Sequence, residues 1–392
     1  MCKRKVIHLH GGTLGPGVNL GDALMLQETV RRIRQRFGPE SQLSIRPEAG
    51  PYPDRAGLRL LQFLKSRSWR HPRQFISYPA LRRYGFLFGV ITGDEVAACL
   101  NFMGYRYFDV GRRETELDLR LTSALRKHGA PSILLPQAYG PFSTPRLRRH
   151  ARQLFDLSAL VYARDTRSAD EVAALGCRRP EVVPDITIAT PAGENPRPDL
   201  AGGVCLIPNR WMTERVAPPD ARAYVASLVA VAKRVRRAGR SCFVLCHAPF
   251  QDQALAERIA GGGEDRIEIV REDDAPKAKA LVGACRFVVG SRYHGLLAAL
   301  SQNVPVLATT WAHKYPGLLD DYRCPEMLAY PSRPDDMAAR LELLLSEAGW
   351  RRCAEPLPAV NAAARERIER MWTRVLSLVH DARPPAAGPP SG

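Results

Sequence analysis

Short apolar runs alternate with longer amphipathic stretches along most of the chain. Apolar residues 6–9 and 287–289 are typical of buried strands, whereas residues 22–37 repeat apolar side chains at spacings of three and four, which predicts a helix with one apolar face. Predicted strands and helices continue to alternate to about residue 347, and a last amphipathic helix covers residues 359–379. This order is typical of α/β proteins with parallel sheets.

A segment rich in proline and glycine, residues 190–203, interrupts the alternation, and we place a domain boundary there. The 392 residues are also too many for one ordinary core. We predict two Rossmann-like, doubly wound α/β domains that face each other across a cleft, a GT-B-like architecture. The expected parts are an N-terminal domain over 1–195 with a basic insertion at about 46–84, a C-terminal domain over 203–355, a C-terminal helix over 356–381 and a disordered tail over 382–392.

The formal net charge is +17, and its basic clusters, at residues 65–73, 146–152 and 233–240, are spread along the chain. Such a charge favours anionic partners, although an arginine-rich composition is also what a GC-rich genome produces. No recognisable nucleic-acid module accompanies the charge, so we do not expect nucleic acid as a partner. Phosphorylated substrates and the anionic surface of a membrane are the preferred alternatives.

The sequence contains no apolar run of the about 18–20 residues needed to cross a bilayer, and its start reads as a strand rather than a signal peptide. The nine cysteines include no C-x-x-C pair, which argues against a disulfide framework and a cysteine zinc site. We therefore predict a cytoplasmic protein, with peripheral contact at the inner face of the plasma membrane as an option. No metal or cofactor is expected.

The candidate chemistry lies in loops that follow predicted strands, where α/β proteins bind their ligands. Ser291, Arg292 and His294 follow one strand just as a helix begins. A guanidinium fork, an imidazole and free helix N–H groups all favour an anion. The alternative is a plain N-cap, a solvated charge and a surface histidine.

A glycine-rich loop, residues 11–22, joins the first strand to the first helix but lacks both the G-x-G-x-x-G spacing and a Walker lysine. Asp22 would repel a phosphate, so we predict that Asn19 and Asp22 bind sugar hydroxyls or accept a proton; Asp22 as a simple helix cap is the alternative. Arg164, at another strand end, is placed to bind a carboxylate or phosphate. Prolines and a glycine in residues 136–142 predict a rigid turn, either a binding wall or purely structural.

Taken together, these motifs resemble the polysaccharide pyruvyl transferases, which place pyruvate ketals on glycans with phosphoenolpyruvate as donor. The matching pieces span residues 11–314 in order: Asn19-Leu20-Gly21-Asp22, residues 136–142, Arg164-Asp165 with Ser168, Val183-Pro184-Asp185, Ser291-Arg292-Tyr293-His294-Gly295 and Lys314. Tyr293 departs from the family's usual leucine, and Thr92-Gly93-Asp94-Glu95 stands where a glycine triplet is common.

The resemblance implies a transferase with phosphoenolpyruvate as co-substrate and a glycan or lipid-linked saccharide as acceptor. We expect arginines from both domains to meet on the donor, and one imidazole or carboxylate to move protons. The expected catalytic residues are His294, Asp22 and Asp185; donor-binding residues are Arg164, Arg292, Ser291, Tyr293, Gly295 and Lys314; acceptor-binding residues are Asn19, Gly21, Asp22, Gln137 and Tyr139.

Two other functions fit parts of the sequence. A GT-B glycosyltransferase that uses a nucleotide sugar would share the architecture, with Glu272, Asp273 or Asp274 binding the ribose. A basic scaffold bound to a membrane or to nucleic acid would explain the charge without catalysis.

Overall fold

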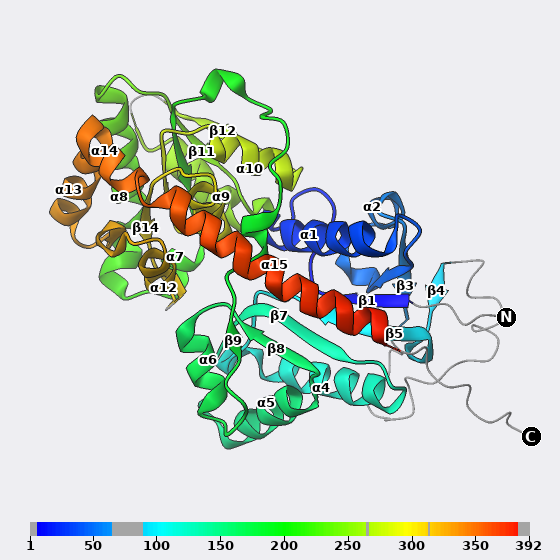
Figure 1. The fold of residues 1–392 in the computed structure, drawn as a ribbon. Coiled ribbons are helices and arrows are strands. Elements are labelled where there is room, and N and C mark those ends of the chain that lie inside the picture. Colours follow the sequence, from blue (N-terminus) through cyan, green and yellow to red (C-terminus); the bar gives the residue numbers. More distant parts are fainter. Residues whose placement is uncertain (1–5, 65–88, 264–265, 313, 383–392) are drawn as a thin grey trace, which may run out of the picture. The chain divides into compact units, whose positions relative to one another are not determined.

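The computed structural model describes residues 6–64, 89–263, 266–312 and 314–382, arranged as two compact units. Unit 1 comprises Met1–Gly15, Met25–Ile186 and Arg367–Gly392; unit 2 comprises Pro16–Leu24 and Thr187–Glu366. Each is a doubly wound α/β domain around one parallel sheet, as predicted, and each is described by itself (Figure 1). The basic cluster 65–73, most of the predicted insertion and the predicted tail from residue 383 onward lie outside the described residues.

The sheet of unit 1 reverses its strand order between β1 and β5. Within the described residues the order is β4-β3-β2-β1-β5-β7-β8-β9, with β6 paired to β7, and all these pairs are parallel. The strands are β1 Val6–His10, β2 Leu43–Ile45, β3 Leu60–Phe63, β4 Val90–Ile91, β5 Val96–Asn101, β6 Tyr105–Tyr107, β7 Ser132–Tyr139, β8 Leu160–Ala163 and β9 Glu181–Val182. The carboxyl ends of β1 and β5 therefore form the switch point of this sheet.

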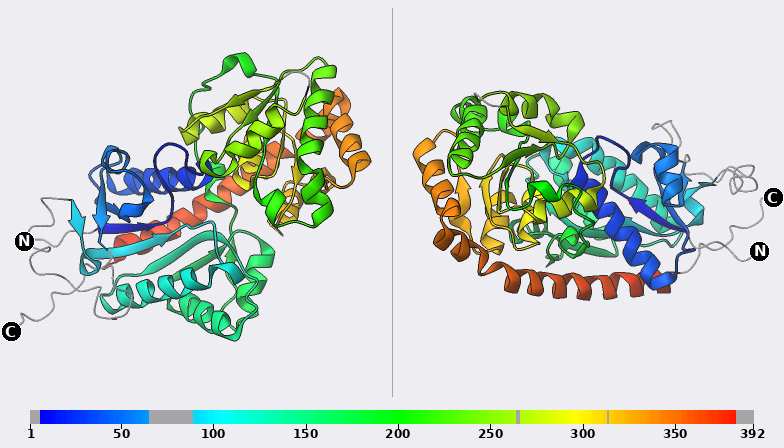
Figure 2. Two further views of the ribbon diagram at one scale, coloured as in Figure 1. Left: turned by 180° about the vertical axis from the view of Figure 1, so that it is seen from behind. Right: turned by 90° about the horizontal axis from the view of Figure 1, so that it is seen from above.

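Helices pack on this sheet through apolar faces, for example where Phe155 and Val172 join the core around Tyr139. The described helices are α2 Tyr52–Gly57, α4 Arg112–Lys127, α5 Pro145–Leu157 and α6 Thr166–Ala173, with short turns η1 Pro47–Ala49, η4 Gly93–Glu95 and η5 Asp109–Gly111. Two longer helices, α1 Leu20–Phe37 and α15 Leu357–Asp381, are divided between the units. Their unit 1 portions run side by side, where the ring of Phe37 stacks on His380 (Figures 1 and 2).

Unit 2 has the Rossmann strand order. Its described sheet runs β12-β11-β10-β13-β14-β15, all parallel, and reverses between β10 and β13. The strands are β10 Val204–Ile207, β11 Cys242–Leu245, β12 Glu268–Val270, β13 Phe287–Gly290, β14 Val306–Thr309 and β15 Leu328–Ala329. A ligand is expected at the carboxyl ends of β10 and β13, where the order reverses.

In unit 2 one or two of the described helices follow each strand. They are α7 Trp211–Glu214, α8 Pro218–Arg237, α9 Pro249–Ala260, α10 Ala275–Gly283, α11 Tyr293–Leu300, α12 Lys314–Asp321, α13 Pro334–Leu345 and α14 Glu347–Ala354, with turns η6 Ile186–Ala189, η7 Pro198–Leu200 and η8 Pro325–Met327. None of the helices that the structure describes is both long and apolar enough to pass through a membrane.

Two features of the fold differ from the sequence-based expectation. The start of α1 belongs to unit 2, because Leu20, Ala23 and Leu24 pack against α10 there. In addition, β7 does not end before Pro136 but continues to Tyr139, with an irregular register against β8. The predicted rigid turn at 136–142 is therefore wrong over its first half, since an irregularity in pairing lets a strand accommodate a proline.

Candidate active site

The loop between β13 and α11 lies at the switch point of unit 2 and is held by buried hydrogen bonds. Hydrogen bonds join the fully buried Ser291 hydroxyl to those of Tyr224 (2.6 Å) and Thr309 (2.5 Å), and the Ser291 carbonyl accepts from the Tyr315 hydroxyl at 2.6 Å. Burial raises the pKa of both tyrosine hydroxyls, which keeps them neutral. Ser291 therefore positions the loop rather than presenting its hydroxyl to a ligand.

Arg292, the next residue, is fixed by an ion pair that the sequence did not suggest. Its Nε and Nη2 donate to the two carboxylate oxygens of Asp252 in α9, at 2.7 and 2.6 Å, and Nη2 also donates to the Gln251 side chain at 2.9 Å. The Asp252 carboxylate is fully buried. This bidentate pair orients the guanidinium and leaves Nη1 outside the fork. The sequence analysis missed Asp252 because nothing in the pattern of its helix indicates that this aspartate side chain is buried.

His294 lies in the first turn of α11, directly against the backbone of Gly21. A Cβ atom on Gly21 would come within 2.1 Å of His294 Nδ1, so position 21 has no room for a side chain. The start of α1 is attached to this place because Leu20 N donates to the His247 carbonyl at 3.2 Å. The structure thus brings the loop at Asn19–Asp22 and the loop at Arg292–His294 together within one unit.

Gly295 has a packing role. A Cβ atom there would lie 2.8 Å from the Ile207 side chain, so the glycine lets α11 approach β10. His247 is part of the same packing, and burial, together with the charges of Arg292 and His294, lowers its pKa to about 3. His247 is therefore neutral, and its contribution to the positive charge of the region is nil.

Asp22 sits among the positively charged groups of this region. Burial raises the pKa of its carboxyl above the ordinary value, while His294, Arg292 and Lys314 act in the opposite direction. Its side chain is still partly exposed. Lys314 also lies close to α11, because its Nζ is 5.4 Å from the ring centre of Tyr293. The two permanent cations, Arg292 and Lys314, are suited to hold a small polyanion, and a carboxyl with a raised pKa beside an imidazole is suited to move protons.

The expected site residues of unit 1 lie in a different environment. Arg164 Nη1 donates to Asp185 Oδ2 at 3.0 Å, and both side chains are almost fully buried. Gln137 donates to the carbonyl and to the side-chain oxygen of Asn101, at 3.1 Å each, and is fully buried in β7.

The expectation that Gln137 and Tyr139 bind the acceptor is not supported by these positions. Tyr139 is fully buried, and its hydroxyl donates to the Tyr162 carbonyl at 3.0 Å. Both side chains are interior because β7 extends through them, so they cannot present their polar atoms to a saccharide. The idea that Arg164 shares a ligand with Arg292 stays a prediction.

A buried polar network that the sequence analysis missed occupies the switch point of unit 1. His10 Nε2 lies 2.8 Å from Asp118 Oδ1, and the Tyr107 hydroxyl and Arg106 Nε both donate to Asp118 Oδ2 at 2.9 Å. Burial acts to raise the pKa of Asp118, but His10, Arg106 and Tyr107 outweigh it and hold that pKa well below its ordinary value. The only available signal was the polar end of an apolar strand at His10.

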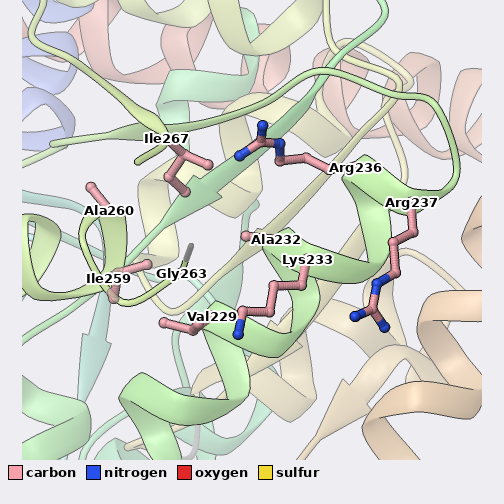
Figure 3. Close-up of a pocket in the computed structure, with 9 residues that line it drawn as sticks. All are labelled: Val229, Ala232, Lys233, Arg236, Arg237, Ile259, Ala260, Gly263 and Ile267. Carbon is pink, nitrogen blue, oxygen red and sulfur yellow. The ribbon is translucent and has the colours of Figure 1, made fainter. Parts of the chain in front are cut away.

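A pocket of about 190 Å³ lies elsewhere in unit 2 (Figure 3). Its apolar floor includes Val229 and Ile259, and Lys233, Arg236 and Arg237 project from α8 at its rim. Most of the pocket residues come from the carboxyl-terminal halves of α8 and α9, which precede β11 and β12. The pocket therefore lies at the amino ends of these strands, whereas Arg292 and His294 lie at the carboxyl end of β13. Among the described residues no group of three or more His, Cys, Asp and Glu side chains is arranged to hold a metal ion.

The fold is that of the GT-B class, as its solved relatives show. A UDP-N-acetylglucosamine 2-epimerase from Listeria monocytogenes is 12% identical, with a TM-score of 0.59 and coverage of 99% of this chain and 100% of the other. Alr3699/HepE from Anabaena, solved with UDP and glucose, is 14% identical, with a TM-score of 0.59 and coverage of 96% and 100%. Trehalose-6-phosphate synthase from Burkholderia multivorans is 11% identical, with a TM-score of 0.52 and coverage of 97% and 98%. At such identities the likeness concerns the fold alone.

The family follows from the sequence itself. The model of the polysaccharide pyruvyl transferase family matches residues 19–313, so the chain belongs to that family of transferases. The matched region contains both loops that meet at His294. No curated protein matches the chain.

Proposed function

We propose that this chain transfers the pyruvyl group of phosphoenolpyruvate to two hydroxyls of a saccharide, forming a pyruvate ketal and releasing phosphate. The observation that carries the proposal is the grouping of Asp22 with Arg292, His294 and Lys314 within unit 2. Family membership supports a pyruvyl transferase, and the site supplies the chemistry that such a reaction needs.

The charge of the group suits this donor. Phosphoenolpyruvate carries a carboxylate and a phosphate on a three-carbon frame, and Arg292 and Lys314 provide permanent positive charge for them. Because Asp252 holds Arg292 by Nε and Nη2, the guanidinium is oriented before the donor arrives. Less ordering is then required on binding.

Proton transfer falls to the two titratable groups. One saccharide hydroxyl attacks the central carbon while the methylene carbon gains a proton; the C–O bond to phosphate then breaks, and a second hydroxyl closes the ketal. One hydroxyl proton ends on the new methyl group and the other on phosphate, so no oxidant is needed. His294 serves as the acid that protonates the donor, and Asp22 as the base that takes the hydroxyl proton.

Asp22 is preferred to Asp185 as the base. The Asp185 carboxylate is almost fully buried and accepts a hydrogen bond from Arg164. Asp22 is partly exposed, and its raised pKa makes it a stronger base than an ordinary aspartate. Arg164 as a further donor-binding arginine remains part of the proposal, as do Tyr293 beside His294 and Asn19 as a contact for the acceptor. A lipid-linked acceptor and peripheral contact with an anionic membrane belong to it as well.

A nucleotide-sugar glycosyltransferase is the second candidate, because Alr3699/HepE, which shares the fold, was solved with UDP and glucose. The three acids expected to bind a ribose are engaged locally. Asp273 accepts from Gly17 N at 2.8 Å, Asp274 caps α10 by accepting from Lys277 N at 2.9 Å, and Glu272 accepts from Asp274 N at 2.8 Å. The acids therefore have structural roles that explain them without a nucleotide.

The test compares the two donors on the intact protein. We expect phosphoenolpyruvate to raise the melting temperature and UDP-glucose to leave it unchanged. Arg292→Lys should abolish the shift, because one ammonium group cannot replace both the pair with Asp252 and the remaining N–H groups of the guanidinium. Mass spectrometry of saccharides incubated with phosphoenolpyruvate should reveal the ketal adduct. Stabilisation by UDP-glucose alone would replace this proposal with the glycosyltransferase.

A further inference from the structure

Two tryptophans with stacked cations lie beside the site of unit 2. Arg210 and Arg215 stack on the Trp211 ring, with guanidinium carbons 4.5 and 3.9 Å from its centre. The Trp211 and Trp311 ring centres are 6.0 Å apart, and Lys314 Nζ lies 4.9 Å from the Trp311 ring. We call Arg210, Trp211, Arg215 and Trp311 the tryptophan cluster.

The topology explains why this cluster adjoins the candidate active site. Trp211 follows β10 and Trp311 follows β14, and these two strands are the neighbours of β13 in the sheet. The loop with Arg292 and His294 follows β13 itself. Because the strands are parallel, all three connections emerge at the same edge, and Lys314 contacts both the Tyr293 ring and the Trp311 ring.

The guanidinium groups of Arg210 and Arg215 form no ion pair with an acid among the described residues, although the backbone N–H of Arg210 donates to Asp252 Oδ1 at 3.0 Å. Arg286 is the useful contrast: it stacks on Trp350 at 4.2 Å and also donates to the Glu347 carboxylate at 2.6 Å. The Nε atoms of Arg210 and Arg286 are both buried and without a hydrogen-bond partner in the described chain, but only the Arg286 guanidinium is neutralised by a carboxylate. A buried donor without a partner is costly, and an anionic ligand would satisfy it.

We infer that the tryptophan cluster is a second subsite that binds the anionic group of a saccharide. A guanidinium stacked on an indole keeps its N–H edge available for a phosphate or carboxylate, while the remaining indole surface suits the apolar face of a sugar ring. This inference rests on the proposed function in one respect: the bound saccharide is the acceptor. The donor's own anionic groups belong to Arg292 and Lys314, so the cluster serves the other substrate.

Binding of simple probes tests the subsite without any reaction. We expect glucose 1-phosphate and glucuronic acid to quench tryptophan fluorescence at concentrations where methyl glucoside does not, and the two acids to distinguish a phosphate subsite from a carboxylate subsite. Arg215→Gln and Arg210→Gln should each weaken binding of the preferred acid by about tenfold or more. Arg215→Lys should recover part of the loss, and the exposed Arg237→Gln, on α8, is the matched control with no expected effect.

The outcomes separate this inference from the proposed function. Equal binding of methyl glucoside and the two acids, or equal weakening by Arg237→Gln, would overturn the subsite. In each variant the melting-temperature shift caused by phosphoenolpyruvate should remain, since the donor lies elsewhere. Absence of that shift in the unaltered protein, with glucose 1-phosphate still bound, would sink the proposed function and leave the subsite standing.

Discussion

The switch points of the two sheets contain similar residue types, but in unit 1 these residues stabilise the fold and in unit 2 they form the candidate active site. In unit 1, His10 and Asp118 lie in a buried network whose members bond to one another. In unit 2, Arg292 forms a buried ion pair with Asp252, and His294, two residues further along the chain, lies near the partly exposed Asp22. Both regions combine a carboxylate, an imidazole and an arginine.

The difference lies in how much of the hydrogen-bonding capacity is used internally. Asp118 receives three donors from its own unit, which lower its pKa and make it a fixed anion. Asp22 has a raised pKa, so its proton is held more firmly than that of an ordinary aspartate. A satisfied network stabilises the fold, whereas a carboxyl poised between protonation states can take part in chemistry.

The largest expected effect is on catalysis, in unit 2. His294→Gln should lower kcat for ketal formation by about 10²–10⁴-fold, the usual contribution of a positioned acid or base, with little change in melting temperature. Phosphate release with phosphoenolpyruvate and acceptor measures it. The matched change in unit 1, His10→Gln, should leave the phosphoenolpyruvate KM unaltered; a similar loss of kcat in a folded His10→Gln protein would erase the contrast between the two switch points.

For the free energy of unfolding we expect the larger effect in unit 1. Asp118→Ala should lower the free energy of unfolding by about 3–5 kcal/mol, because Arg106 and His10 would lose the carboxylate that compensates them in the interior. Asp22→Asn should leave stability the same or slightly higher, since burial disfavours the ionised carboxyl there. Urea denaturation at neutral pH compares them, and equal destabilisation by both changes would contradict the distinction.

The pH dependence should have opposite signs in the two regions. Asp118 has a depressed pKa when folded, so its stabilising effect is present above the ordinary value of about 3.9 and is lost as the pH falls towards the folded pKa. Asp22 has a raised pKa, so its effect on stability is favourable below about 3.9 and is lost as the pH rises through the folded pKa. As a base it must be ionised, so kcat/KM should fall at acid pH with a midpoint above the ordinary pKa of an aspartate. A profile unchanged by Asp22→Asn would exclude that role.

The smallest effect concerns Tyr139, which the sequence favoured as an acceptor contact. Tyr139→Phe removes one buried hydrogen bond to the Tyr162 carbonyl and should cost about 0.5–1.5 kcal/mol of stability. The acceptor KM should stay the same, whereas Asn19→Ala should raise it. A higher acceptor KM in Tyr139→Phe would contradict this structural role and support Tyr139 as an acceptor-binding residue.

The sequence was sufficient for the fold class and for the loops that carry chemistry in unit 2. Alternating apolar runs located β10, β13 and the helices between them, and the polar residues after β13 marked its strand end. It failed at β5, where Val96–Asn101 is a central strand of unit 1 although its short apolar run gave no period to read. It also failed for Asp252 and Asp118, because a helix pattern does not reveal which polar side chain turns inward to meet a residue far along the chain.

The division of α15 has a consequence for how the polypeptide is made. Residues to Glu366 belong to unit 2, but those from Arg367 onward, including the buried Trp372, complete unit 1. Pro16–Leu24, near the beginning, in turn complete unit 2. During synthesis, unit 1 therefore cannot complete its core before α15 has left the ribosome. Two fragments made by cutting the chain between Ile186 and Thr187 would each lack a piece of their own core.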